Sequence, residues 1–393
     1  MKNKITLRDF SSAQKRREFL EKELNTDLKN IGCFSFEEEK AVGRNIENLV
    51  GAAQIPLGVA GPLRVKSLES RVKDYYMPLA TTEGALVASV SRGCKVVTEA
   101  GGATVYIENV GMTRGPVFKV KNLTEAIKTQ AWIEKNLKNL TKIAESTSSH
   151  LKLTKADCQI TGRNLFVRFY FDTADAMGMN MATIATQLLA QEIEEKTKAV
   201  CISVAGNFDI DKKPAWLNFI SGRGKRVWAE VVLSKKAVKD VLKTTPQKIA
   251  EVVYRKCNLG SVMSGSLGFN AHYANIIAAL FAATGQDLAH TVEGSLGITT
   301  AEVLENGDLY FSIYLPSLVV GTVGGGTHLP TQQEALKIMK VNNVLEYARV
   351  LGGAVLAGEL SLLASLAEGT LAKAHQRLGR RNQESRDKSQ GKQ

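Results

Sequence analysis

Residues 151–173 read LKLTKADCQITGRNLFVRFYFDT, and this stretch decides the fold of the middle of the chain. Apolar and polar side chains alternate on both sides of Thr161-Gly162-Arg163. Alternation with a period of two is the pattern of a half-buried strand, and a glycine between two such runs favours a tight turn. The stretch therefore predicts two antiparallel strands joined as a hairpin.

The elements outside this hairpin complete a known unit. Before it, FKVK (118–121) is typical of a strand, and NLTEAIKTQAWIEKNLKNL (122–140) has the apolar spacing of a helix. After it, the sequence predicts a helix over 177–197 and a strand at AVCISVA (199–205). The order β-α-β-β-α-β is that of the split βαβ, ferredoxin-like unit. We therefore expect a compact domain over about 116–204, inserted into the rest of the chain.

The flanking segments, 44–115 and 205–378, are rich in small residues, and we expect them to form one large, mostly helical domain. Helices are predicted from near Glu83 and over 246–258, 266–284, 331–340 and 343–375, with one strand at LYFSIYLP. An N-terminal segment (1–43) holding a charged helix at 12–30 and a disordered tail (379–393) complete the chain. The predicted class is α+β.

Composition restricts the functions that the chain can have. With 393 residues, 44% of them hydrophobic, the chain can bury a sizeable core in two or three domains. The formal charge is +12, but the basic residues are dispersed and aromatic residues make up only 6%. Nucleic-acid binding needs clustered basic and aromatic side chains, so we expect no nucleic-acid partner. The charge is either ordinary surface charge or a field that steers a polyanionic small molecule.

The sequence also predicts the compartment. Five cysteines without a CxxC pair fit a reducing cytoplasm. The N-terminus lacks the apolar core of a signal peptide. The longest apolar stretch, residues 350–372, contains Glu359 and Glu368 and therefore predicts a buried helix and not a membrane span. We expect a soluble, cytoplasmic protein that makes no contact with a membrane.

The usual site signatures are missing, and the remaining candidate stretches are ambiguous. GxGxxG after a strand, GxxxxGK[ST], HExxH and GxSxG are absent, and the five histidines are scattered, so no metal site is predicted. Glu83 could serve chemistry or merely cap a helix. The Met-rich helix start at 173–183 could bind a phosphate or ribose or pack in the core, and the glycine loop at 321–330 could approach a ligand or form a structural turn.

Seven stretches taken together, in this order, carry a resemblance. They are ENLVGAAQIPLGVAGPL (47–63), PLATTEGALVASVSRGC (78–94), ENVGMTRGPV (108–117), DAMGMNM (175–181), DKKPAWLNFISGRGK (211–225), GFNAHYANIIAALFAATGQD (268–287) and GTVGGGTHLP (321–330). The chain closely resembles 3-hydroxy-3-methylglutaryl-coenzyme A (HMG-CoA) reductases over residues 44–378, and among them the class with eukaryotic and archaeal members. We expect no counterpart of the membrane anchor of animal members.

The resemblance implies an NAD(P)H-dependent four-electron reduction of the thioester, through a thiohemiacetal and an aldehyde, to mevalonate and coenzyme A. Lys212 matches the family's catalytic lysine, which stabilises the oxyanion, and Glu83 matches the glutamate that donates a proton. A glutamate in that role needs a raised pKa. Asp287 matches the aspartate that couples those two groups, and His375 matches the histidine that protonates the departing thiolate.

Further positions match binding residues of the family. The acyl group is expected to meet Arg114, Asp211, Lys213 and Lys256, with Asn275 supporting the catalytic lysine, and coenzyme A to meet Ser89 and Arg92. The cofactor, NADPH or NADH, is expected to meet Asp175, Met179, Asn180, Gly324, Gly325, Gly326 and Thr327. Residues 47–51 match a dimer interface, and members of this family share active sites between subunits, so we expect a homodimer or a higher even oligomer.

Three positions depart from the family's pattern. Ala205 aligns with a serine that touches substrate in many members, which keeps a paralogue with another acyl group as an alternative. Ser149 aligns with an arginine that holds the 2′-phosphate of NADPH in animal enzymes, so the choice between NADPH and NADH stays open, although Lys152 could compensate. Arg381 aligns with the serine of a phosphorylation switch, so we expect no such regulation.

Overall fold

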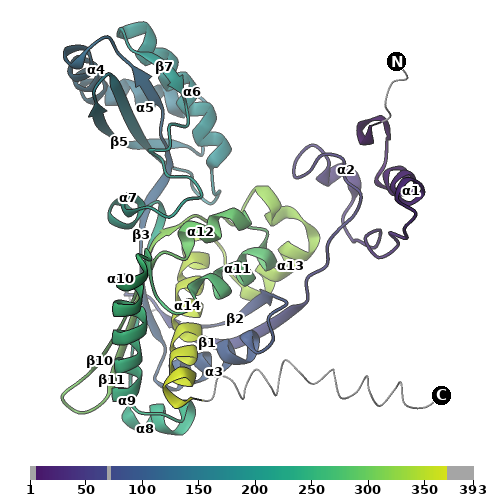
Figure 1. Ribbon diagram of the computed structural model, residues 1–393, viewed down its shortest axis with the longest axis vertical. Coiled ribbons are helices and arrows are strands. Elements are labelled where there is room, and N and C mark those ends of the chain that lie inside the picture. The colour runs from purple at the N-terminus through teal and green to yellow at the C-terminus, as the bar shows by residue number, and fades with distance from the viewer. Residues whose placement is uncertain (1–5, 69–71, 370–393) are drawn as a thin grey trace.

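The computed structural model describes residues 6–68 and 72–369. Two hydrophobic cores organise these residues. One contains side chains from Met112 to Ala199 together with Val319, and the other gathers side chains from Ala60 to Ala364 on both sides of that stretch in the sequence. Figure 1 shows the corresponding two bodies, one above the other. The arrangement confirms the predicted α+β class with an inserted unit.

The smaller body has the predicted order of elements. It contains β4 (Val117–Lys119), α4 (Leu123–Lys135), α5 (Leu137–Glu145), β5 (Lys152–Thr161), β6 (Asn164–Asp172), α6 (Met179–Lys196) and β7 (Val200–Ser203). Its strands lie in the order β7-β4-β6-β5, and all neighbouring strands are antiparallel, which is the ferredoxin-like arrangement. The hairpin of residues 152–172 is confirmed, with a turn at Gly162 and Arg163.

The helix predicted over 122–140 is in fact two helices. Asn136 ends α4, because its side-chain amide donates to the Trp132 carbonyl at 2.8 Å and its backbone leaves helical geometry. The chain then starts α5 at Leu137. Asparagine competes for main-chain hydrogen bonds in this way, so one side chain accounts for the break.

The larger body holds more sheet than the sequence predicted. Its strands are β1 (Leu57–Lys66), β2 (Val72–Ala80), β3 (Ala103–Arg114), β8 (Gly224–Leu233), β9 (Gly268–Phe269), β10 (Gly297–Val303) and β11 (Leu309–Leu318). They lie in the order β2-β1-β3-β8-β11-β10-β9. Strand β3 serves both bodies, since Thr104–Gly111 pairs with β8 and Met112–Arg114 pairs with β6.

Helices pack against this sheet. They are α3 (Leu86–Glu99), α7 (Trp216–Ser221), α8 (Lys235–Ala237), α9 (Pro246–Val252), α10 (Ser261–Ser264), α11 (Tyr273–Thr284), α12 (Thr291–Gly294), α13 (Pro330–Met339) and α14 (Val344–Glu368), with π-helical turns at Val238–Leu242 and Val253–Gly260 and 3-10 turns at Leu288–His290 and Gly325–His328. A further 3-10 turn, Leu7–Asp9, belongs to the N-terminal segment. Residues 266–272 of the predicted helix 266–284 lie outside α11, because Gly268 and Phe269 form β9 and pair with β10.

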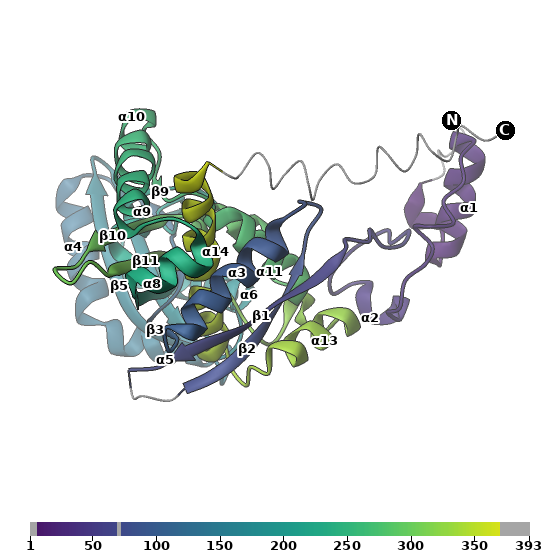
Figure 2. The ribbon, with the colours of Figure 1, turned by 90° about the horizontal axis from the view of Figure 1, so that it is seen from below.

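Helix α14 is the central element of the larger body, as Figure 2 shows. It is long and apolar enough to cross a bilayer, but 83% of its most apolar window is buried inside the protein, as predicted for this stretch. Glu359 within it accepts hydrogen bonds from the Ala271 and His272 amides and from Thr299. A buried carboxylate with three donors fits a core helix, because such donors offset the loss of water.

The N-terminal segment stands away from both bodies (Figure 1). It contains α1 (Ala13–Leu24), where a helix over 12–30 was predicted, and α2 (Glu38–Ala41). Arg16 of α1 is buried and donates to the carbonyls of Leu7, Phe10 and Leu49, which holds the segment together.

The chain enters and leaves the smaller body at one point. Gly206 donates its amide to the Gly115 carbonyl at 2.6 Å, so the two connections lie side by side. A Cβ atom on Gly115 would lie 2.5 Å from the Asp209 amide nitrogen, so only glycine lets the two segments approach. The junction therefore places the loop 209–213 between the two bodies.

Candidate active site

The loop 209–213 between β7 and α7 carries the two adjacent lysines. Ile210 and Lys212 have positive φ angles of 51° and 57°. For side chains with a Cβ atom this region costs about 1–3 kcal/mol, and a β-branched isoleucine is seldom found there. Contacts with the rest of the protein must therefore hold the loop in this shape.

One of these contacts is an ion pair between Lys212 and Asp287. The Lys212 Nζ lies 2.9 Å from Asp287 Oδ2, and Asp287 caps the 3-10 turn after α11 by accepting from the Ala289 amide. Burial raises the pKa of Asp287, but the hydrogen bonds from Lys212 and the Ala289 amide and the charge of His290 lower it by more, so the pKa lies below its usual range. The structure thus brings together two of the predicted catalytic residues.

A second ion pair joins Arg114 to Asp209. Arg114 Nη1 lies 3.1 Å from Asp209 Oδ2 and 3.6 Å from Met179 Sδ, so the arginine reaches from β3 towards both the loop and α6. Asp209 is 1% exposed. Burial raises the pKa of Asp209, and the charges of Arg114 and Arg223 oppose part of that rise. Sequence reasoning assigned no role to Asp209, although its position two residues before Asp211 could have pointed to it.

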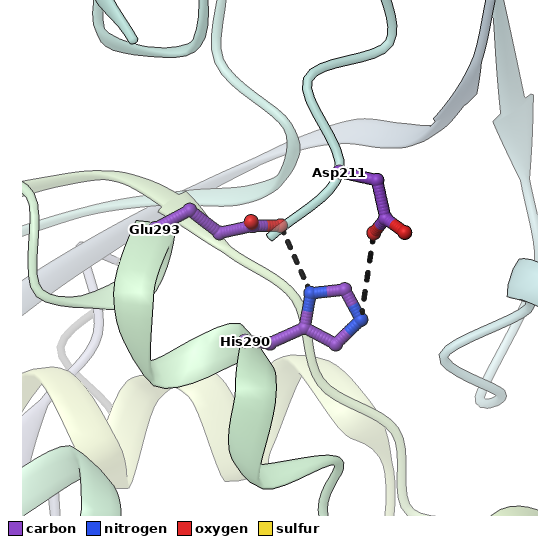
Figure 3. A group of neighbouring side chains, drawn as sticks. All are labelled: Asp211, His290 and Glu293. Atoms are coloured by element: carbon purple, nitrogen blue, oxygen red, sulfur yellow. Dashed lines mark hydrogen bonds and ion pairs between the residues drawn. The ribbon is translucent and has the colours of Figure 1, made fainter. Parts of the chain in front are cut away.

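A buried network fixes Asp211, the next acidic residue of the loop. Arg223 donates to Asp211 Oδ1 at 3.1 Å and also makes a close ion pair with Glu293. The same oxygen of Glu293 lies 2.9 Å from His290 Nδ1. Figure 3 shows Asp211, His290 and Glu293 facing one another. Sequence reasoning missed Arg223, His290 and Glu293, although the three-residue spacing of His290 and Glu293 directly after Asp287 was visible.

Three of these side chains are of types that bind metal ions. Asp211, His290 and Glu293 each offer a ligand atom, and these atoms lie within 4.8 Å of one another. The scattered histidines of the sequence did not predict such a group. However, the guanidinium of Arg223 pairs with both carboxylates. We therefore interpret the group as an ion-pair network in which an arginine already neutralises the acids.

Glu83 and Asn275 line one cavity, of about 500 Å³, together with Leu288, which follows Asp287 in the chain. Glu83 is exposed and precedes α3, whose first turn is preceded by Ala85 at φ 76° and receives no side-chain cap. The interpretation of Glu83 as a helix cap is therefore wrong. The cavity places the predicted proton donor on the same side of α11 as Asn275.

The expected coenzyme A contacts lie on α3 and are tied to α14. Ser89 Oγ lies 3.0 Å from Ser361 Oγ, and Arg92 donates to Ser361 and to Ser365. Burial lowers the pKa of Arg92. These contacts bind the two residues to the last turns of α14, which precede the stretch that carries His375.

The remaining predicted acyl-group and catalytic residues are placed as follows. Lys213 is exposed, and its Nζ donates to the Asp211 carbonyl at 3.0 Å. Lys256 is exposed on the π-helical turn Val253–Gly260. Ala205 follows β7, and its carbonyl accepts from Ser203 at 3.2 Å. His375 and Arg381 lie outside the described residues.

The two predicted parts of the cofactor site meet in the structure. The Asp175 carbonyl accepts from the amides of Thr322 and Val323, so the start of α6 and the glycine loop lie side by side. The side chain of Asp175 also accepts from the Val344 amide at 2.8 Å and so anchors the start of α14. Met179 packs against the smaller core, as the packing interpretation proposed, whereas Asn180 is exposed.

The glycine loop presents open backbone. Gly324 and Gly325 have φ angles of 78° and 56°, and a Cβ atom on either would meet no atom of residues 6–68 and 72–369 within 4 Å. Gly326 instead packs on Gly285, and the Thr327 hydroxyl donates to the Gly324 carbonyl at 2.7 Å. Gly326 and Thr327 therefore form a packed structural turn, whereas the backbone of Gly324 and Gly325 is accessible.

A polar cavity lies near the turn where α5 meets β5. Ser148, Ser149, His150, Lys152 and Asp172 line it. It contains both the serine that departs from the family's pattern and the lysine that was expected to compensate. The cavity has donors for an anion, and it also has two carboxylates, Glu145 and Asp172, that would repel one.

Comparison with known proteins agrees with these motifs. A sequence profile of the hydroxymethylglutaryl-coenzyme A reductase family matches residues 12–380. The chain is 53% identical over 374 residues to the 3-hydroxy-3-methylglutaryl-coenzyme A reductase of Methanocaldococcus jannaschii, covering 93% of this chain and 92% of that protein. It is 52% identical over 369 residues to the reductase of Methanothermobacter thermautotrophicus, with the same two coverages.

A solved structure shares the fold. The class II 3-hydroxy-3-methylglutaryl-CoA reductase from Streptococcus pneumoniae, bound to NADPH, superposes with a TM-score of 0.68 at 19% identity, covering 91% of this chain and 97% of that one. The family profile and the identity over nearly the full length of archaeal reductases settle the relationship. The chain belongs to the hydroxymethylglutaryl-coenzyme A reductase family of oxidoreductases.

Proposed function

We propose that this protein reduces HMG-CoA to mevalonate and coenzyme A, with two molecules of NADPH. The observation that carries the proposal is the ion pair between Lys212 and Asp287 in a loop at the junction of the two bodies. Around it lie Arg114 with Asp209 and Arg223 with Asp211, which supply fixed cations and acids for a small anionic acyl group.

Bound NADPH would supply one hydride to the thioester carbonyl carbon in the first step. As the new C–H bond forms, the carbonyl π electrons move to oxygen, and Lys212 stabilises the resulting oxyanion. A preorganised cation at such an oxygen contributes several kcal/mol of transition-state stabilisation. Asp287 orients Lys212 through the 2.9 Å ion pair.

The second stage breaks the C–S bond of the thiohemiacetal. The thiolate of coenzyme A leaves and takes a proton from His375, and the aldehyde remains. A second hydride and a proton from Glu83 convert the aldehyde to the alcohol. Overall, two hydrides and two protons are consumed for each mevalonate and coenzyme A released, so the electrons balance.

The acyl group itself needs cations at its free carboxylate. Arg114 supports this role, because its Nε is buried and has no hydrogen-bond partner within the described residues. A buried donor without a partner is costly, so a bound carboxylate would satisfy it. We assign Lys213 and Lys256 to the same carboxylate, Asp211 to the substrate hydroxyl, Asn275 to Lys212, and Ser89 and Arg92 to coenzyme A.

We assign the cofactor site to the start of α6 and the glycine loop, with Asp175, Met179, Asn180 and the run Gly324 to Thr327. The open backbone of Gly324 and Gly325 supports the assignment, because a pyrophosphate can approach a main chain without side chains. The cavity at Lys152 and His150 lies on the same body and offers cationic and hydroxyl donors for the 2′-phosphate of NADPH.

We further propose a homodimer that works in the cytoplasm. Ile46, Ile55, Leu57 and Val59 are each more than 40% exposed, and they flank residues 47–51, the segment that resembles the family's dimer interface. A group of exposed apolar side chains marks an interaction surface. A partner subunit on this surface would also cover Glu83, whose cavity includes Ile55.

The decisive experiment adds HMG-CoA to the purified, folded protein and follows the absorbance of NADPH and of NADH. We expect oxidation of two cofactor molecules per substrate. Lys212→Ala should lower turnover roughly a hundredfold or more, since it removes the cation at the oxyanion, while calorimetric binding of HMG-CoA persists. Failure of the wild-type protein to oxidise either cofactor would refute the proposal. Activity with a different acyl-coenzyme A alone would favour the paralogue that Ala205 suggests.

A further inference from the structure

His290 occupies an unusual position among the acids of the site. It is fully buried, and its Nδ1 lies 2.9 Å from Glu293 Oε1. Its Nε2 lies 3.6 Å from Asp287 Oδ2 and 4.0 Å from Asp211 Oδ1, as Figure 3 shows for Asp211. Within the described part of the chain this Nε2 makes no hydrogen bond. A buried polar atom without a partner, aimed at two carboxylates, calls for an explanation.

The partners of Glu293 decide which ring nitrogen of His290 carries a proton. Arg223 pairs with Glu293, so that carboxylate is an acceptor in this network. A carboxylate acceptor requires a donor, and His290 Nδ1 must therefore carry hydrogen. In a neutral ring, the Nε2 lone pair would then point at the oxygens of Asp211 and Asp287, which is unfavourable. In an imidazolium, an N–H would point at them instead.

We propose that His290, as an imidazolium, is a positioning residue that shares Asp287 with Lys212. This inference rests on the proposed function, because it concerns the same oxyanion site. Lys212 and His290 Nε2 approach the same oxygen, Asp287 Oδ2, at 2.9 and 3.6 Å. The positive charge of the imidazolium offsets part of the negative charge of Asp287. The positive charge of Lys212 is then less compensated by Asp287, and Lys212 stabilises the substrate oxyanion more strongly.

The charged groups around the ring support the imidazolium. Facing it are Asp211 and Lys212 from the loop, Asp287 from the turn after α11, Glu293 from α12 and Arg223 from the residue before β8. Among the residues that the structure describes, three carboxylates surround the ring, and two cations other than His290 pair with them. The nearby Arg114 is occupied by Asp209, and Arg168 binds the neutral oxygens of Asn218 and Gly222. One further positive charge at His290 balances the group.

Two substitutions separate this role from packing. His290→Asn can keep the hydrogen bond to Glu293 but loses the atom that faces Asp287. His290→Gln reaches about as far as Nε2 and can donate to Asp287 but cannot titrate. His272→Gln is the matched control, because His272 is a partly buried histidine whose Nε2 contacts the Gly358 carbonyl. Turnover, KM for HMG-CoA and thermal stability are measured for each variant from acid to alkaline pH.

We expect His290→Asn to lower kcat roughly tenfold at neutral to acid pH, less than the loss of a group that touches the oxyanion. KM for HMG-CoA should change by no more than about threefold, because Arg223 still holds Asp211. The ratio of wild-type to variant kcat should shrink towards one as pH rises, since the wild-type imidazolium then loses its proton. His290→Gln should recover part of the activity, and His272→Gln should behave as the wild type.

The proposal would be overturned by a ratio of wild-type to His290→Asn kcat that equals one or does not change with pH. It would also be overturned if His272→Gln lost as much kcat as His290→Asn. These outcomes are distinct from failure of the proposed function, in which the wild-type protein itself is inactive. If the His290 variants do not fold, imidazole NMR of His272→Gln labelled with ¹⁵N-histidine gives the answer. A buried ring with slowly exchanging protons on both nitrogens is expected, and a buried ring with one proton would refute the proposal.

Discussion

At the scale of single residues, the loop 209–213 shows how strain and charge are combined. Ile210 and Lys212 adopt left-handed backbone conformations, and each acid of the loop is paired with an arginine from outside it. Strained residues persist where surrounding contacts determine them, and they gather at functional sites. The pairs that hold the loop are also the charges that the substrate would meet, so binding and loop geometry are coupled.

Lys152 carries a prediction about cofactor choice. Lys152→Ala should raise KM for NADPH about tenfold, the loss of one charge-assisted hydrogen bond to a phosphate, and leave KM for NADH nearly unchanged. Lys155→Ala is the control, because Lys155 lies on the same strand but pairs with Asp157. Steady-state kinetics with both cofactors test this. Equal effects on NADPH and NADH would place the 2′-phosphate elsewhere.

The residues of the site were predictable only where they lie in recognisable stretches. Lys212 and Asp287 were named from their motifs, and the structure pairs them. Arg223, Glu293 and His290 act through burial and through contacts between segments far apart in the sequence. Neither composition nor spacing reports such contacts, so sequence reasoning did not find them.

At the scale of elements, the crossing of α3 and α14 depends on one glycine. A Cβ atom on Gly93 would lie 1.9 Å from the Ala357 carbonyl oxygen. Gly93→Ala should therefore lower the free energy of unfolding by about 1–3 kcal/mol or more, because main chain must move apart. Lys95→Ala on the exposed side of α3 should change it by no more than about 0.5 kcal/mol. Urea unfolding compares the two, and an equally stable Gly93→Ala would contradict the packing.

The start of α14 carries a prediction about pH. Burial raises the pKa of Glu346, but hydrogen bonds from Lys73, the Asn342 amide and Tyr75 lower it by more, so its pKa lies below the usual range. Its contribution to stability is therefore present above the unfolded-state pKa of about 4.3 and is lost as pH falls through the folded-state value.

Glu346→Gln should accordingly destabilise the protein by about 1–2 kcal/mol near neutral pH, with a difference that shrinks as pH falls below about 4. Glu334→Gln, at an exposed residue of α13, should show no such difference. Urea unfolding at a series of pH values measures both. A Glu346→Gln effect that does not depend on pH would show that the carboxylate charge is not what stabilises this helix start.

Elements were predicted best where their pattern is local. The hairpin of residues 152–172 has two strand-like runs around a glycine turn, and its neighbours follow in order, so the inserted unit was predicted correctly. The break at Asn136 depends on one side-chain hydrogen bond. Strands β1 and β2 escaped notice because each contains a proline, and β1 also two glycines, which are unusual inside strands. They pair with each other, and β1 also pairs with β3.

At the scale of the whole molecule, the apolar segment 46–59 carries the prediction about assembly. Leu57→Asp should shift the protein from twice the chain mass of 42.7 kDa towards one chain mass, because it places a charge in the apolar surface. Leu123→Asp, at an equally exposed leucine of α4, should leave the mass unchanged. Light scattering after size exclusion measures both. A wild-type monomer would contradict the proposed homodimer.

The sharing of β3 between the two sheets limits how the molecule can move. Thr104–Gly111 and Met112–Arg114 belong to one strand. The smaller body is therefore not joined to the larger one by flexible loops alone, and it cannot rotate freely. Reorientation has to twist a hydrogen-bonded strand, which resists torsion more than a loop does. The inserted unit therefore moves as a rigid body, and any rotation is concentrated at residues 111–114. Amide hydrogens of these residues should exchange more slowly than those around Gly206, in the segment that leads from β7 back to the larger body.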